Sequence, residues 1–163
     1  MKLRISHGVS AGALVLLAAA ISLSVHAKEQ PMATASGPFD VKLSALDAYN
    51  RDDASMGRRA IDKQFHGALE ATSRGEMLSV GTARDNGGYV AIERVTGTLD
   101  GRAGSFALQH NATMTAGVPY MNIVVVPGSG TGALSGIAGR MTIDIAAGGA
   151  HSYRFEYELP PGA

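Results

Sequence analysis

Most of this chain alternates between apolar and polar residues, and glycine-rich segments interrupt the alternation at short intervals. The clearest case runs from His151 to Leu159, where Tyr153, Phe155, Tyr157 and Leu159 alternate with serine, arginine and two glutamates. A period of two places the apolar side chains on one face of a β-strand. No stretch after Ala27 carries the 3.6-residue apolar stripe of a helix. The alternation therefore predicts an all-β fold.

The same criterion predicts eight strands joined by short linkers. They cover residues 39–44, 58–65, 68–77, 89–99, 105–114, 120–126, 139–146 and 151–159. Linkers such as Asp85-Asn86-Gly87-Gly88 favour antiparallel hairpins, whereas the longer segment 46–57 is predicted as a loop. Eight strands in so short a chain indicate a closed barrel or a compact sandwich, and a barrel leaves no exposed sheet edge.

The N-terminus has the three zones of a secretory signal peptide. Lys2 and Arg4 precede an apolar run from Ala11 to Val25, and small residues at Val25 and Ala27 suit cleavage after Ala27. The alternative is an uncleaved anchor, but a membrane span needs about 20 residues. We therefore expect a signal peptide at 1–27, a disordered linker at 28–38 and one domain at 39–160. The expected location is the bacterial periplasm or the medium, without membrane association after cleavage.

Charge and cysteine content exclude several classes of function. Without Lys2 and Arg4, 12 basic residues face 14 acidic residues, and no basic stripe is present. Nucleic acid is therefore not an expected partner. The chain has no cysteine, so disulfides, thiolate metal sites and thiol nucleophiles are all excluded.

A nine-residue segment is repeated along the chain. Residues 96–104 and 131–139 agree at six of nine positions, with Leu-x-Gly-x-Ala-Gly in both. Gly101 and Gly136 are predicted to take the first central position of a two-residue type II′ hairpin turn. A phosphate-binding loop is the alternative, but it requires a following helix, and residues 105–114 alternate as a strand.

Four segments resemble a bacterial family catalogued as domain of unknown function 3224. They are DKQFHG (62–67), SRGEML (73–78), GYVAIERVTG (88–97) and GSFALQH (104–110). The resemblance spans about Phe39 to Leu159. It implies an eight-stranded antiparallel β-barrel similar to that of allene oxide cyclase, and it implies no activity. The predicted signal peptide is a departure, because many similar proteins begin near Phe39 and look cytoplasmic.

Strand phase predicts one polar pair inside the barrel. His110 shares a face with Phe106 and Leu108, and Glu93 shares a face with Tyr89. A two-residue turn at Gly101 and Arg102 would set Glu93 directly opposite His110, with Cβ atoms about 4.5–5.5 Å apart. We therefore predict a Glu93–His110 pair that projects into the barrel, with Tyr89 beside it.

Three interpretations of this pair remain open. The pair can be purely structural, it can bind a polar group of a ligand, or it can act as a general base. A zinc site built from His66, His110 and His151 lacks the usual paired spacing, and the segment at Asp52 lacks the pattern of a calcium loop. We predict no metal and no cofactor.

The outward face of the strand at 89–99 is partly apolar. Val90 and Ile92 point outward there, as Val124 and Val126 do on a later strand, and such a face needs a cover. A homo-oligomer is the expected cover, and the loop 46–57 is the alternative.

The expected function is binding of a small, mainly apolar ligand inside the barrel, near Glu93, His110 and Tyr89. No catalytic motif is present. A cyclase or isomerase by fold analogy, and a structural homo-oligomer with a filled barrel, are the alternatives.

Overall fold

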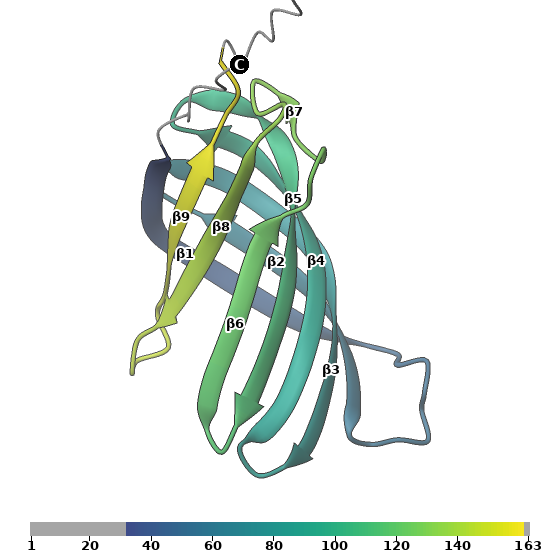
Figure 1. Cartoon of the computed structure of the whole chain (residues 1–163). Helices are drawn as coiled ribbons and strands as arrows, with labels where there is room; N and C mark the ends of the chain where they lie inside the picture. Colours follow the sequence, from purple (N-terminus) through teal and green to yellow (C-terminus); the bar gives the residue numbers. More distant parts are fainter. Residues whose placement is uncertain (1–31, 162–163) are drawn as a thin grey trace, which may run out of the picture.

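The computed structural model describes residues 32–161, which form one twisted β-sheet closed into a barrel (Figure 1). The predicted signal peptide, its cleavage site at Ala27 and the first residues of the predicted linker lie outside the described residues. No helix that could cross a membrane is present between residues 32 and 161.

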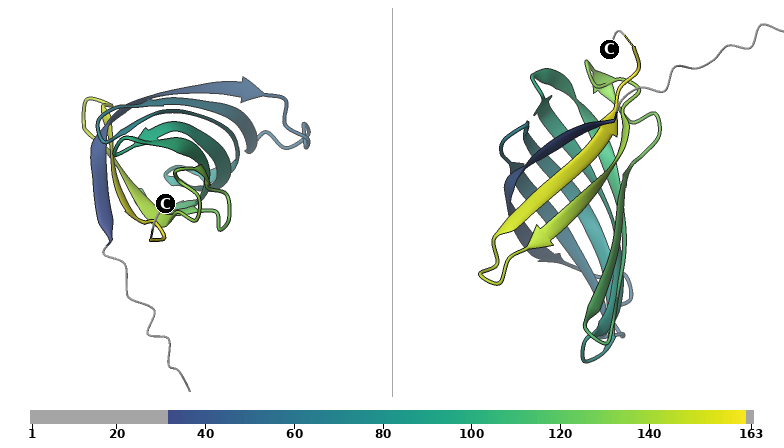
Figure 2. Two further views of the ribbon diagram at one scale, coloured as in Figure 1. Left: turned by 90° about the horizontal axis from the view of Figure 1, so that it is seen from above. Right: turned by 60° about the vertical axis from the view of Figure 1, so that its left-hand side comes forward.

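Eight antiparallel strands make the wall of the barrel, and a ninth, two-residue strand is added beside β5. The strands are β1 (Ala33–Leu46), β2 (Met56–Phe65), β3 (Leu69–Ala83), β4 (Asn86–Leu99), β5 (Arg102–Thr115), β6 (Val118–Val125), β7 (Thr131–Gly132), β8 (Ala138–Ile145) and β9 (His151–Glu158). The order β4-β3-β2-β1-β9-β8-β6-β5 returns to β4 through a β4–β5 pairing. Seen from above, the strands wrap into a ring (Figure 2). The prediction of an all-β, eight-stranded antiparallel barrel is confirmed.

The first strand begins earlier than the sequence pattern indicates. Residues 33–39 pair with β9, and Ala35 and Phe39 are buried in the core. The prediction that residues 28–38 are a disordered linker is therefore wrong from Ala33 onward. Small residues such as alanine, serine and glycine give little periodic signal, and β9 supplies the hydrogen-bond partners that order them.

The hairpin between β4 and β5 has a different turn from the predicted one. Asp100 and Gly101 both have positive φ, 48° and 78°, which is the signature of a type I′ turn with Gly101 in the second central position. Leu99 therefore pairs with Arg102. The predicted register is wrong by two residues, so that Glu93 lies opposite Leu108 and His110 lies opposite Ala91.

The second copy of the repeat is not a hairpin. Gly136 lies between β7 and β8, in a loop where the Ile137 N–H donates to the Leu134 carbonyl. The two copies instead meet in space, because Gly97 and Gly132 pair with Gly104 from its two sides.

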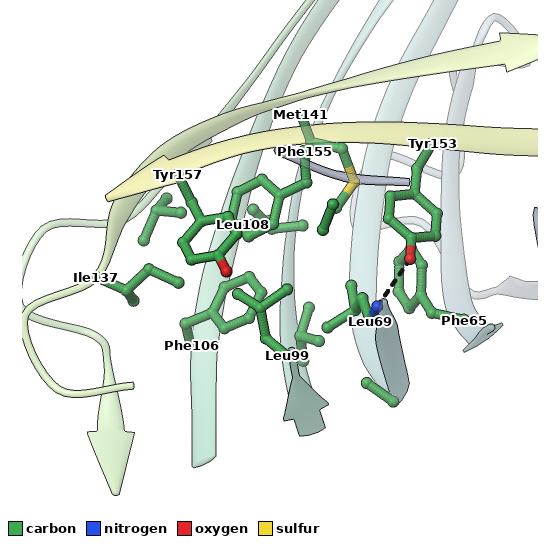
Figure 3. Close-up of a cluster of buried hydrophobic side chains, with 14 of the residues drawn as sticks. Phe65, Leu69, Leu99, Phe106, Leu108, Ile137, Met141, Tyr153, Phe155 and Tyr157 are labelled. Atoms are coloured by element: carbon green, nitrogen blue, oxygen red, sulfur yellow. Dashed lines mark hydrogen bonds between the residues drawn. The ribbon is translucent and has the colours of Figure 1, made fainter. Parts of the chain in front are cut away.

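Large apolar side chains fill the end of the barrel near β7, which we call the closed end (Figure 3). Phe155 stacks between Phe106 and Tyr157, with ring centroids 5.4 Å apart in both cases. The Tyr153 hydroxyl accepts from the Leu69 N–H at 2.9 Å. The closed end is thus a packed core that includes a satisfied tyrosine.

The other end of the barrel, which we call the open end, lies toward the β5–β6 and β8–β9 hairpins. Strands β6 and β8 pair only at Ile123 with Met141 and at Val124 with Arg140. Beyond these pairs the two strands diverge, as Figure 1 shows. The wall is therefore parted on this side, and inward-facing apolar residues such as Met121 and Ile145 remain exposed.

Candidate functional site

The candidate site lies where the packed core ends, around the buried carboxylate of Glu93. Glu93 is on β4 with its side chain inside the barrel and is 0% exposed. Its neighbour across β3 is Gly75. A Cβ added at Gly75 would lie 2.6 Å from both Cα and Cβ of Glu93, so the glycine allows this close approach.

Three side chains from three other strands hold the Glu93 carboxylate. Lys63 Nζ on β2 lies 2.6 Å from Oε1, and His110 Nε2 on β5 lies 2.8 Å from the same oxygen. The Ser73 hydroxyl on β3 donates to Oε2 at 2.6 Å. We call Lys63, Ser73, Glu93 and His110 the buried cluster. All four side chains are buried, and pairing of this kind is what makes buried charge tolerable.

The ionisation of Glu93 follows from this surrounding. Burial by itself would raise the pKa of Glu93. The hydrogen bond from His110 and the positive charge of Lys63 outweigh it and lower the pKa from 4.5 to about 2. The carboxylate is therefore an anion at neutral pH. Burial and this charge also raise the pKa of Tyr89 above 10.

The three predicted site residues lie close to one another. Glu93 and His110 are hydrogen-bonded although they are not opposite in register, because alternate residues of neighbouring strands still share a face and reach diagonally. The Tyr89 ring lies 6.4 Å from the His110 ring, centroid to centroid. Their use in binding a ligand stays a prediction.

The histidines do not form the triad that a zinc site would need. His66 directly follows β2 and lies 3.6 Å from Asp40 and 3.5 Å from Glu70. His151 packs on Phe39, with ring centroids 5.1 Å apart. Among residues 32–161, no group of three histidine, cysteine or acidic side chains is placed to hold a metal ion.

A cavity of about 300 Å³ occupies the open end next to the buried cluster. Its walls are mainly apolar, and its polar contributors are Lys63, Tyr89, His110 and His151. The lining residues are Phe39, Val41, Leu43, Ile61, Lys63, Met77, Tyr89, His110, Met121, Ile143, Ile145 and His151. We call this space the barrel cavity. Because Met121 belongs to β6 and both Ile143 and Ile145 belong to β8, the cavity adjoins the parting of these strands.

A second hollow of about 400 Å³ adjoins the barrel cavity near the β3–β4 and β5–β6 hairpins. Met77, Tyr89 and Met121 line both spaces. Methionine side chains are flexible and can adapt to differently shaped ligands. The Tyr89 ring therefore stands between two adjoining spaces rather than deep in the core.

Sequence reasoning missed Lys63 and Ser73. The period-two pattern of the strand at 58–65 does place Lys63 on the same face as Ile61 and Phe65, which is a signal for a buried lysine. Ser73 pairs directly with Lys63 across β2 and β3. Its role depends on that register, which the pattern of β3 alone does not indicate.

Comparison with known proteins identifies a family and a related structure. The family model described as "Protein of unknown function (DUF3224)" matches residues 35–157. The crystal structure of a DUF3224 protein of unknown function from Shewanella oneidensis MR-1 is 47% identical, with a TM-score of 0.76. The match covers 81% of this chain and 100% of that one. No curated protein matches the chain.

Proposed function

We propose that this chain, which belongs to the DUF3224 family of proteins of unknown function, binds a small, mainly apolar ligand in the barrel cavity. One observation carries the proposal. The barrel is packed at the closed end and hollow at the open end, and a buried charged cluster lies between the two. Ligand sites are typically apolar hollows with a few polar groups that fix orientation.

A purely structural role explains the buried cluster but not the cavity beside it. Phe106, Leu108, Met141 and Tyr153 would fill the whole interior in a structural barrel, yet they pack the closed end only. Apolar side chains normally close such a space, since each unfilled volume costs packing energy. A hollow that has Lys63 and His110 in its lining is better suited to hold a ligand than to a purely structural role.

Catalysis by Glu93 as a general base is less well supported. A base works best when its pKa lies near the working pH, and the pKa of Glu93 is lowered to about 2. Both carboxylate oxygens also already accept hydrogen bonds. The role that we assign to Glu93 is to hold Lys63 and His110 in place at the edge of the cavity.

The test is native mass spectrometry of the mature chain purified from a bacterial host. We expect an additional mass that is lost on unfolding. Ile143→Trp should reduce this mass by filling the barrel cavity, while Thr142→Trp, on the adjacent and exposed position of β8, should retain it. Two results together would count against binding: the native chain carries no bound mass, and both variants have the thermal midpoint of the native chain.

We also propose that the chain is exported and that a second copy covers part of its outer face. Leu78, Val90 and Ile92 are 51%, 52% and 58% exposed on neighbouring strands β3 and β4. The loop at 47–55 leaves them uncovered. Light scattering should report a dimer that Ile92→Lys dissociates, and a monomer would contradict the second copy.

Export is tested by the N-terminus of the recovered protein. An N-terminus at Lys28 would support export, and retention of Met1 would contradict it.

A further inference from the structure

We propose that the ligand of the barrel cavity is an apolar carboxylic acid whose carboxylate lies against Lys63, Tyr89 and His151. This inference rests on the proposed function, because it specifies the chemistry of the same cavity. The size and the apolar walls of the cavity do not indicate which polar group the ligand carries. The polar side chains in the lining do.

Among residues 32–161, no acidic side chain lines the cavity. The polar members of the lining are one lysine, one tyrosine and two histidines, and every other lining residue is apolar. The carboxylate that contacts two of the lining residues, Glu93, is 0% exposed and lies behind Lys63 and His110. A ligand in this space therefore meets four side chains that can donate hydrogen bonds, and the acceptor-only side chains in the lining are the weakly accepting thioethers of Met77 and Met121.

Glu93 is fully engaged by the protein itself. Its Oε1 is shared by Lys63 and His110, and its Oε2 accepts from Ser73. A ligand amine would have to displace one of these donors to reach the carboxylate. It would also be brought next to the Lys63 ammonium, and like charges at short range repel.

Donors remain available on the cavity side. The Lys63 ammonium has three N–H groups, and among the residues that the structure describes only Glu93 accepts a hydrogen bond from it. The side chains of Tyr89 and His151 line the cavity and make no side-chain hydrogen bond to any residue within the described part of the chain. A carboxylate offers two oxygens to such donors, and charge-assisted hydrogen bonds of this kind are the stronger ones.

The apolar residues of the lining indicate the chemistry of the rest of the ligand. Two isoleucines of β8, Ile143 and Ile145, and two methionines, Met77 and Met121, surround the path toward the parted strands. Burial of each CH₂ group of a ligand in such a space is favourable. An unbranched or weakly branched hydrocarbon body fits this lining, with its acid group directed at Lys63.

The experiment uses the mature chain, stripped of bound material, and three probes of equal length: decanoate, 1-decanol and decylamine. Isothermal titration at pH 7.5 should show decanoate binding about tenfold more tightly than decanol, because only the carboxylate accepts charge-assisted hydrogen bonds from the lining. Decylamine should bind more weakly than decanol. Equal affinities for all three, or a preference for the amine, would overturn the inference while leaving apolar binding intact.

Two variants locate the contact without disturbing the buried cluster. The double variant Tyr89→Phe, His151→Phe should weaken decanoate binding about tenfold and change decanol binding less than about twofold. Equal weakening of both probes would show that the two residues contribute shape rather than hydrogen bonds and would overturn the assignment. If none of the probes binds the native chain, the proposed function fails together with the inference.

Discussion

His110 Nε2 lies 2.8 Å from Glu93 Oε1, although the residue that faces His110 across the β4–β5 hairpin is Ala91. The contact is therefore diagonal, and it depends on side-chain reach rather than on direct cross-strand pairing. Lys63 approaches the same oxygen from β2. One carboxylate thus connects strands on both sides of β4, at the level where the packed core gives way to the barrel cavity.

Replacement of Glu93 should destabilise the barrel strongly. Glu93→Gln leaves Lys63 buried without its counter-charge, and breaking a buried pair in this way costs about 3–5 kcal/mol. Urea unfolding should show that loss. Ser73→Ala removes a single hydrogen bond to the same carboxylate and should cost about 1–2 kcal/mol. Equal, small losses in the two variants would mean that the Lys63–Glu93 pair adds nothing to the stability.

Stability should fall in acid because of Glu93. Its pKa is lowered from 4.5 to about 2 in the folded chain, so below pH 4.5 the unfolded chain binds a proton that the folded chain does not. The stabilisation is complete above about pH 5 and is lost between pH 4.5 and 2, on the order of 3 kcal/mol. Unfolding free energies measured from pH 2.5 to 6 should show it, and Glu93→Gln should have a flatter profile.

Gly75→Ala should be much more costly than Gly81→Ala on the same strand. A Cβ at Gly75 would lie 2.2 Å from the Ile92 carbonyl oxygen and 2.6 Å from Glu93 Cβ, whereas one at Gly81 meets nothing within 4 Å. We expect a loss of about 2 kcal/mol or more for Gly75→Ala, together with a shift of the His110 ring signals in NMR spectra. Similar midpoints for both variants would show that β3 and β4 separate easily.

Gly101→Ala should destabilise the hairpin through its backbone alone. The site is open, with nothing within 4 Å of an added Cβ, but φ is +78°. A left-handed conformation costs a non-glycine residue about 1–2 kcal/mol. Gly148→Ala, also in open space but without the positive φ, is the matched control and should be near neutral in thermal unfolding. A cost for Gly148→Ala equal to that for Gly101→Ala would contradict the type I′ assignment.

The local pattern of the chain predicted more of the fold than of the site. Alternation identified β2 to β6, β8 and β9, but not the two-residue β7, and it identified the inward faces that carry Tyr89, Glu93 and His110. It missed the start of β1, because alanine, serine and glycine at 33–38 have no marked alternation. It also misplaced the hairpin turn, since Asp100-Gly101 and Gly101-Arg102 are both plausible turn dipeptides that differ in register by two residues.

What the sequence determined by itself is which face of each strand a side chain occupies, because that depends only on a period of two along one strand. This is why Glu93 and His110 could be placed inside the barrel despite the wrong register. Only the tertiary structure decided which inward residues meet. Lys63 and Ser73 reach Glu93 across β2 and β3, and the cavity exists because β6 and β8 part after two residue pairs. Contacts between strands depend on register and barrel closure, which no single strand encodes.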